Sequence, residues 1–180
     1  MLLANPGVFG MKHFPLMARF NEWVNRQLYD KVATLDDAAY RADCGIFFGS
    51  IHHTLNHLLV VDRLWLGRIT GVDRGIRSLD QLLYEDLPSL RAAREEEDRG
   101  LIKLVDEMPE ERIDAVVRFS TIKRDRHFEA RTRDLLSGMF NHQTHHRGQI
   151  YAVLQQRGME LPDIDLPFFL PQIGEARLIG

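Results

Sequence analysis

Apolar residues recur at spacings of three and four along four long stretches of the chain, a spacing typical of amphipathic helices. These stretches cover about residues 15–35, 47–69, 88–108 and 131–158. Pro15 and Pro88 suit the first turn of a helix, and Gly158 suits the position after the last turn. Long helical stretches with few strands between them predict an all-α fold, a four-helix bundle.

Two other segments have a different pattern. Residues 115–130 alternate weakly between apolar and polar side chains, which predicts a short β-hairpin between the third and fourth helices. The C-terminal segment LPDIDLPFFLPQIG holds three prolines, so we expect an extended strap over residues 161–180. No internal repeat or linker-like run interrupts the chain. We therefore expect a single domain over residues 1–180, with the bundle over about 12–160.

Composition and charge narrow the class of protein. With a net charge of −3 and a pI near 6.2, the chain lacks the excess of basic residues that binding to nucleic acid requires, so we expect no nucleic-acid partner. The single cysteine, Cys44, can form neither an internal disulfide nor a thiolate metal cage. No stretch reaches the ~18 to 20 apolar residues of a membrane helix, and the first residues lack a basic leader. We expect a cytoplasmic protein with no membrane partner.

Histidines are concentrated in two of the predicted helices. Six of the eight fall in two clusters, one on the second helix and one on the fourth: His52, His53 and His57, and His142, His145 and His146. At about 100° per residue, His142 and His146 lie within the apolar stripe of the fourth helix, whereas His145 lies about 100° from its centre. His57 is flanked by apolar residues and points into the protein.

These inward histidines have two interpretations. Each could be a core residue with its own hydrogen-bond partner. Alternatively, His142 and His146, one turn apart, share one ion with His57 from a facing helix. A single divalent ion satisfies all three imidazoles, which favours a metal site. The metalloprotease motif HExxH is excluded, because Gln143 stands in the place of its general base and an amide cannot accept that proton.

The positions of four other polar residues on the second helix predict whether each is exposed or buried. His52, Asn56 and Arg63 lie on the only side of that helix that looks solvent-facing. Asp62 lies about 140° from His57 and should not share its ligand shell. We expect Asp62 to be a buried acid that pairs with a base such as Arg147 or accepts from an indole N–H.

Three segments together resemble the DinB/YfiT-like family over about residues 12–160: FNEWVNRQL, TLNHLLVVDRLWL and NHQTHHRGQIYAVLQQRG. The resemblance implies an up-down-down-up four-helix bundle, often a homodimer, with a divalent metal bound by three histidines. Carried over residue by residue, the ligands are His57 of TLNH and the outer two of HQTHH, His142 and His146. The helical positions select the same three residues.

Three imidazoles leave a coordination position open, as in a catalytic metal site. Such an ion lowers the pKa of bound water or holds a thiolate as a nucleophile. Zinc or nickel is our first expectation, although imidazole ligands also suit iron and copper. His53 and His145 are the nearest candidates for a general base, and packing roles are favoured for both.

The family resembled is functionally mixed. Some members resemble S-transferases that use low-molecular-weight thiols, and others look like hydrolases or isomerases. We therefore expect a metal-dependent enzyme of thiol S-transferase or hydrolase type that acts on a small molecule. The alternative is a non-catalytic, metal-stabilised dimeric bundle with a stress-response or binding role.

Overall fold

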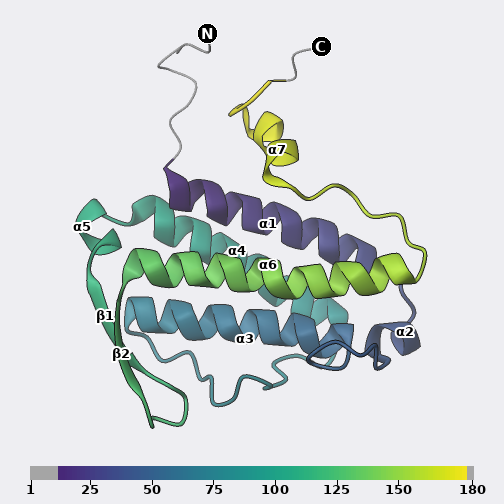
Figure 1. The fold of residues 1–180 in the computed structure, drawn as a ribbon, viewed down its shortest axis with the longest axis horizontal. Coiled ribbons are helices and arrows are strands. Elements are labelled where there is room, and N and C mark those ends of the chain that lie inside the picture. The colour runs from purple at the N-terminus through teal and green to yellow at the C-terminus, as the bar shows by residue number, and fades with distance from the viewer. Residues whose placement is uncertain (1–11, 178–180) are drawn as a thin grey trace.

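The computed structural model describes residues 12–177. Four long helices pack side by side (Figure 1): α1 (His13–Val32), α3 (Ile51–Thr70), α4 (Leu87–Glu107) and α6 (Thr132–Gln156). Each contacts two neighbours, α1 and α3 both lying against α4 and α6. Along the chain, α1 and α6 run in one direction and α3 and α4 in the other. The predicted up-down-down-up bundle is confirmed.

The predicted hairpin lies between α4 and α6. Strands β1 (Val116–Ser120) and β2 (His127–Arg131) pair antiparallel, and Phe119 stands opposite Phe128. The rings of these two phenylalanines stack with centroids 5.4 Å apart. Two short helices that the apolar pattern did not predict are α2 (Asp37–Arg41) and α5 (Glu110–Ile113). The structure therefore confirms the hairpin and adds two helical turns at the bundle ends.

The second long helix begins later than predicted, at Ile51 and not near Phe47. The Ser50 side chain accepts a hydrogen bond from the backbone N–H of His53, which is a strong start signal for a helix. Phe47 and Phe48 consequently lie in the loop before α3. This placement lets Phe48 contact the histidines described below.

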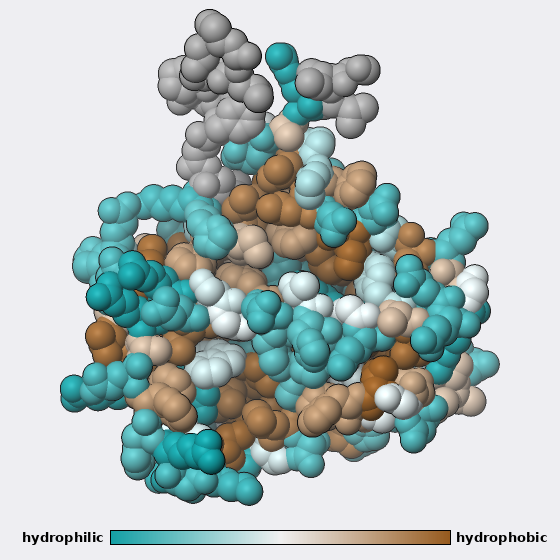
Figure 2. Space-filling model, in the orientation of Figure 1, coloured by the Kyte–Doolittle hydropathy of each residue, from teal (hydrophilic) through white to brown (hydrophobic). Residues whose placement is uncertain are grey.

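The C-terminal segment is not the extended strap that its prolines predicted. Residues 161–165 are irregular, but α7 (Leu166–Phe169) and the 3₁₀ helix η1 (Leu170–Ile173) follow them. Proline is compatible with a first helical turn, and each of these turns has a proline as its second residue. Phe169 is buried on α1 against Phe20 and Trp23. Figure 2 shows apolar side chains gathered over this part of α1. Residues 178–180 lie outside the described residues.

The connection from α3 to α4 covers one side of α3. Because these helices run in the same direction, residues 71–86 return along the bundle (Figure 1). The Asn56 side chain accepts from the backbone N–H groups of Leu83 and Tyr84 and donates to the Tyr84 carbonyl. His52 contacts the Tyr40 hydroxyl of α2 at 2.8 Å. The expectation that His52 and Asn56 face solvent is therefore wrong, and both are buried.

Asp62 belongs to a group of buried polar side chains that lies between the long helices. Its Oδ2 accepts from the Arg94 guanidinium at 2.7 Å and from the Gln143 amide at 2.7 Å. Arg94 also lies 2.9 Å from an Asp98 oxygen. Asp62 therefore pairs with Arg94 of α4, and the predicted pairing with Arg147 is wrong. The helical period placed Asp62 on the buried side but could not say which neighbouring helix carries the base.

The same group continues into α1 and back to α6. Asn25 donates to both Asp98 oxygens, and Arg147 donates to the side-chain oxygens of Asn21 and Asn25. These contacts connect all four long helices in a closed path. We call the group the polar circuit: Asn21, Asn25, Asp62, Arg94, Asp98, Gln143 and Arg147. All seven residues are buried.

None of the helices within residues 12–177 combines the length and the apolarity that a membrane crossing requires.

Candidate metal centre

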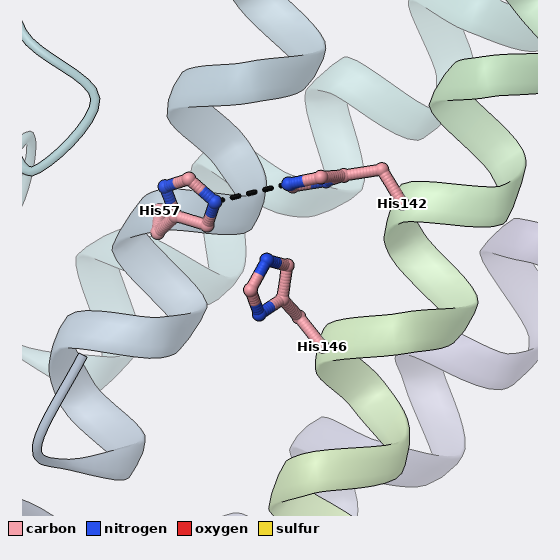
Figure 3. Close-up of side chains that lie close together, drawn as sticks. All are labelled: His57, His142 and His146. Atoms are coloured by element: carbon pink, nitrogen blue, oxygen red, sulfur yellow. Dashed lines mark hydrogen bonds between the residues drawn. The ribbon is translucent and has the colours of Figure 1, made fainter. Parts of the chain in front are cut away.

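The structure brings His57, His142 and His146 together between α3 and α6 (Figure 3). Their ring centroids lie 4.5 to 4.9 Å apart. One nitrogen from each ring can be chosen so that all three atoms lie within 4.8 Å of one another. Among residues 12–177, no carboxylate or thiol joins these three imidazoles. We call these residues the histidine triad.

Hydrogen bonds fix which ring nitrogen two of the histidines present. The Nδ1 of His57 lies 2.7 Å from the Leu79 carbonyl oxygen, and the Nδ1 of His146 lies 2.8 Å from Gln149 Oε1. Both oxygens are acceptors, so each Nδ1 carries the proton and donates it. The Nε2 of each ring is then left with a free lone pair, which is the arrangement of a metal-binding imidazole.

The third imidazole has no comparable partner. His142 Nδ1 is buried without a hydrogen bond, and His142 Nε2 lies 3.0 Å from His57 Nε2. Two nitrogens at that separation fit on one ion, because Zn–N bonds measure about 2.0–2.1 Å. The two Nε2 atoms share one proton, which His142 Nε2–H donates to His57 Nε2 (Figure 3), and a divalent ion can take the place of that proton between them. The buried His142 Nδ1 is left without a partner. The residues present therefore fit a divalent metal ion.

Burial keeps these imidazoles neutral. It lowers the pKa of His57 to about 4 and that of His142 to about 3, and it also lowers the pKa of His146. Removal from water penalises the charged form, and the neighbouring imidazoles add to this effect for His142. At neutral pH all three rings can therefore bind a metal without first losing a proton.

Aromatic and apolar side chains surround the triad. The Phe48 ring stacks on His57 with centroids 3.8 Å apart and lies 5.5 Å from the His146 ring. His57 and His142 also line a cavity of about 930 Å³. Its other walls are mostly apolar and include Phe48, Val61, Leu64, Trp65, Phe119 and Phe128. The triad therefore has access to a space large enough for a small molecule.

The other candidate residues lie outside the triad. His145 and His53 are exposed, and His53 Nδ1 lies 2.8 Å from the Ser50 hydroxyl. The rejection of His145 as a direct ligand agrees with this position. Gln143 is directed to Asp62 and the Leu58 carbonyl, away from the triad.

Sequence reasoning missed three groups that shape the site. The Leu79 carbonyl, Phe48 and Gln149 orient or cover the imidazoles. Gln149 follows His146 by three residues, so its place on the same helix face was available from spacing. No sequence signal indicated Leu79, because the path of the 71–86 connection is a tertiary feature.

Comparisons with known proteins agree with this fold. The DinB family model matches residues 10–176. Protein DinB of Bacillus subtilis (strain 168) is 26% identical over 160 residues, which cover 84% of this chain and 90% of that protein. A crystal structure of a DinB-like protein from Bacillus cereus ATCC 10987 matches with a TM-score of 0.63 and 16% identity, over 83% of this chain and 94% of the other. The chain belongs to the DinB family.

Proposed function

We propose that the protein is a metal-dependent enzyme of thiol S-transferase or hydrolase type, with His57, His142 and His146 as the metal ligands. The observation that carries the proposal is the convergence of three neutral imidazoles beside an apolar cavity. Catalytic zinc sites use three protein ligands and keep one position for water or substrate. A closed structural site uses four protein ligands, and the triad offers three.

Zinc or nickel is the proposed ion, since imidazole nitrogens suit both and the triad includes no thiolate. Such an ion, when bound, supplies Lewis acidity that activates a water molecule or a small thiol. The protein's own part is to hold the imidazoles in place and to exclude bulk water. Leu79 and Gln149 fix the two rings, and Phe48 covers the triad from the loop before α3.

The substrate proposed is a small molecule, with a low-molecular-weight thiol as one reactant in the transferase case. The apolar walls of the cavity support an electrophile with an apolar body as the other reactant. A homodimer is also part of the proposal and rests on the family resemblance, whereas the proposed cytoplasmic location rests on the single cysteine.

Metal analysis of untagged protein tests the ligand set. We expect about one zinc or nickel ion per chain after metal loading and dialysis. His57→Ala, His142→Ala and His146→Ala should each lose the ion, whereas the exposed His145→Ala is the matched control and should keep it. Equal metal content in all four variants would exclude the triad as the site.

A second experiment separates catalysis from a structural role. The loaded protein is assayed with several small thiols and electrophiles, and with carboxylic esters, beside the metal-free protein. Turnover that depends on the ion supports the enzyme. If chelation lowers the melting temperature and no assay responds, the non-catalytic metal-stabilised bundle is the better description.

A further inference from the structure

One face of α3 runs from the triad to an arginine along the floor of the cavity. His57 and Arg68 are eleven residues apart, which is three turns plus about 20°, so they share a face and lie about 16 Å apart along the axis. Val61, Leu64 and Trp65 occupy the intervening turns of that face, and all of them line the cavity. The floor is therefore apolar between an imidazole at one end and a cation at the other.

Arg68 has an unusual environment. Its guanidinium carbon lies 4.5 Å from the ring centroid of Trp65 and 4.8 Å from that of Phe119. Trp65 lies one turn earlier on α3 and Phe119 lies on β1, so the guanidinium is held between the helix and the hairpin. One Nη2 hydrogen is donated to the Ser120 carbonyl at 2.7 Å. The aromatic rings and this bond hold the group in place and leave most of its donors free.

No carboxylate neutralises Arg68 within the described chain. Between residues 12 and 177, no acidic oxygen lies within 4.0 Å of its nitrogens, whereas the nearby Arg63 and Arg74 both pair with Glu97. Burial lowers the pKa of Arg68, and no acidic neighbour offsets that effect. A fixed, partly buried and unpaired guanidinium is suited to bind an anion.

The charged side chains that line the cavity carry a net positive charge. Basic side chains outnumber acidic ones there: Arg77, Lys123 and Arg126 join Arg68, against Asp80 and Asp125. Both acids already accept a hydrogen bond, from the hydroxyls of Ser78 and Thr121 respectively. Arg77 is itself paired with Asp73 outside the cavity. The rim therefore attracts an anionic ligand, and Arg68 is the one cation set over aromatic rings.

We propose that the cavity binds an amphipathic anion, with a carboxylate or sulfonate on Arg68 and an apolar body over Val61, Leu64 and Trp65. The opposite end of the molecule then reaches the triad, where the reactive group belongs. The proposal that the reactive end of this ligand lies at the triad rests on the proposed function. The anion site itself depends on Arg68 and the apolar floor.

Decanoate and decan-1-ol test the anion site, because they share an apolar body and differ in charge. Binding is measured by isothermal titration below the micelle concentration, with metal-free and with zinc-loaded protein. We expect Arg68→Met to weaken decanoate binding at least tenfold and to leave decanol binding unchanged. Arg68→Lys keeps the charge and should retain part of the decanoate affinity.

Two matched controls accompany these variants. Arg118→Met removes the same charge from an exposed arginine that lies outside the cavity and pairs with Glu129, and it should leave decanoate affinity unchanged. Leu64→Ser should weaken both ligands several-fold by removing part of the floor. Leu82→Ser, at an exposed apolar residue outside the cavity, should weaken neither. Circular dichroism confirms that each variant is folded.

The proposal is overturned if decanoate does not bind, or if Arg68→Met and Arg118→Met weaken it equally. A gel-filtration shift to a dimer that excludes both ligands would also overturn it, because a second copy would then cover the cavity. His142→Ala distinguishes the two hypotheses. If this variant loses no metal but Arg68 governs decanoate binding, the proposed metal function fails and the anion site stands.

Discussion

The bundle buries two polar groups of opposite character, and α6 contributes adjacent residues to both. Gln143 and Arg147 belong to the polar circuit, whereas His142 and His146, each one residue earlier, belong to the histidine triad. In the circuit, two guanidinium groups balance two carboxylates, and its contacts join all four long helices. The triad carries no charge at neutral pH, lies on α3 and α6 alone, and leaves His142 Nδ1 without a hydrogen-bond partner.

The difference indicates what each group does. A buried network whose charges meet one another fixes how helices pack, even though Asp62 Oδ1, Arg94 Nε and Gln143 Oε1 have no hydrogen-bond partner of their own. In the triad, one nitrogen of each ring lies within 4.8 Å of the other two, so a single ion can bind all three. The circuit therefore sets the position of α6, and this places the two α6 imidazoles opposite His57. Four predictions test this division of roles.

We expect the largest loss of stability when the cation at the centre of the polar circuit, Arg94, is removed. Arg94→Met leaves the carboxylates of Asp62 and Asp98 buried without their partner, and we expect a loss of about 3–5 kcal/mol in unfolding free energy. Arg91→Met is the matched control, because Arg91 pairs at the surface with Asp30 and Glu95. It should cost about 0–1 kcal/mol. Urea unfolding measures both, and equal losses would contradict the role of the circuit.

Metal should stabilise the folded protein through the triad. Zinc at one hundred times its dissociation constant should raise the unfolding free energy by about 2.7 kcal/mol, because it binds only the folded state. His142→Ala should abolish this gain, whereas the exposed His145→Ala should retain it. Thermal unfolding with and without zinc provides the measurement. The same zinc response in both variants would remove the triad from the account.

A single substitution on α6 distinguishes the two groups directly. Gln143→Glu creates the sequence HExxH, but the side chain at this position faces Asp62, with the amide nitrogen 2.7 Å away. We expect a loss of about 1–3 kcal/mol, since the new carboxylate meets another buried acid. Zinc affinity should stay the same. Tighter zinc binding or peptidase activity would show that residue 143 belongs to the metal site.

The unfolding free energy of the metal-free protein should fall gradually as the pH is lowered. The pKa of His57 is about 4 and that of His142 about 3 in the folded protein, against about 6.5 in the unfolded chain. Between these values the unfolded chain binds more protons, so stability falls as the pH drops from about 6.5 toward 4. The double variant His57→Gln and His142→Gln should have a shallower slope of urea midpoint against pH. An unchanged slope would contradict the buried neutral state.

The periodicity of the sequence identified the triad because its members lie on regular helices. Angular positions placed His142 and His146 on one face and His57 on the facing helix, and the structure brings all three together. The four long helices and the hairpin followed from the same patterns. Within a helix, the direction of a side chain depends on local spacing alone, and spacing is visible in one sequence.

Features that depend on contacts between distant segments were not accessible in this way. The burial of His52 and Asn56 follows from α2 and the 71–86 connection, whose paths no local pattern specifies. Asp62 was correctly expected to be buried with a base, but the choice of Arg94 depends on how α4 packs. The prolines of the C-terminal segment were interpreted as helix breakers, although two of them are the second residues of α7 and η1.

The most direct test is an anomalous-scattering map of zinc-loaded crystals at the zinc edge. We predict one strong peak per chain, about 2.0–2.1 Å from a ring nitrogen of each of His57, His142 and His146. A peak at the exposed His53 or His145, or no peak between α3 and α6, would contradict the assignment of the triad as a metal centre.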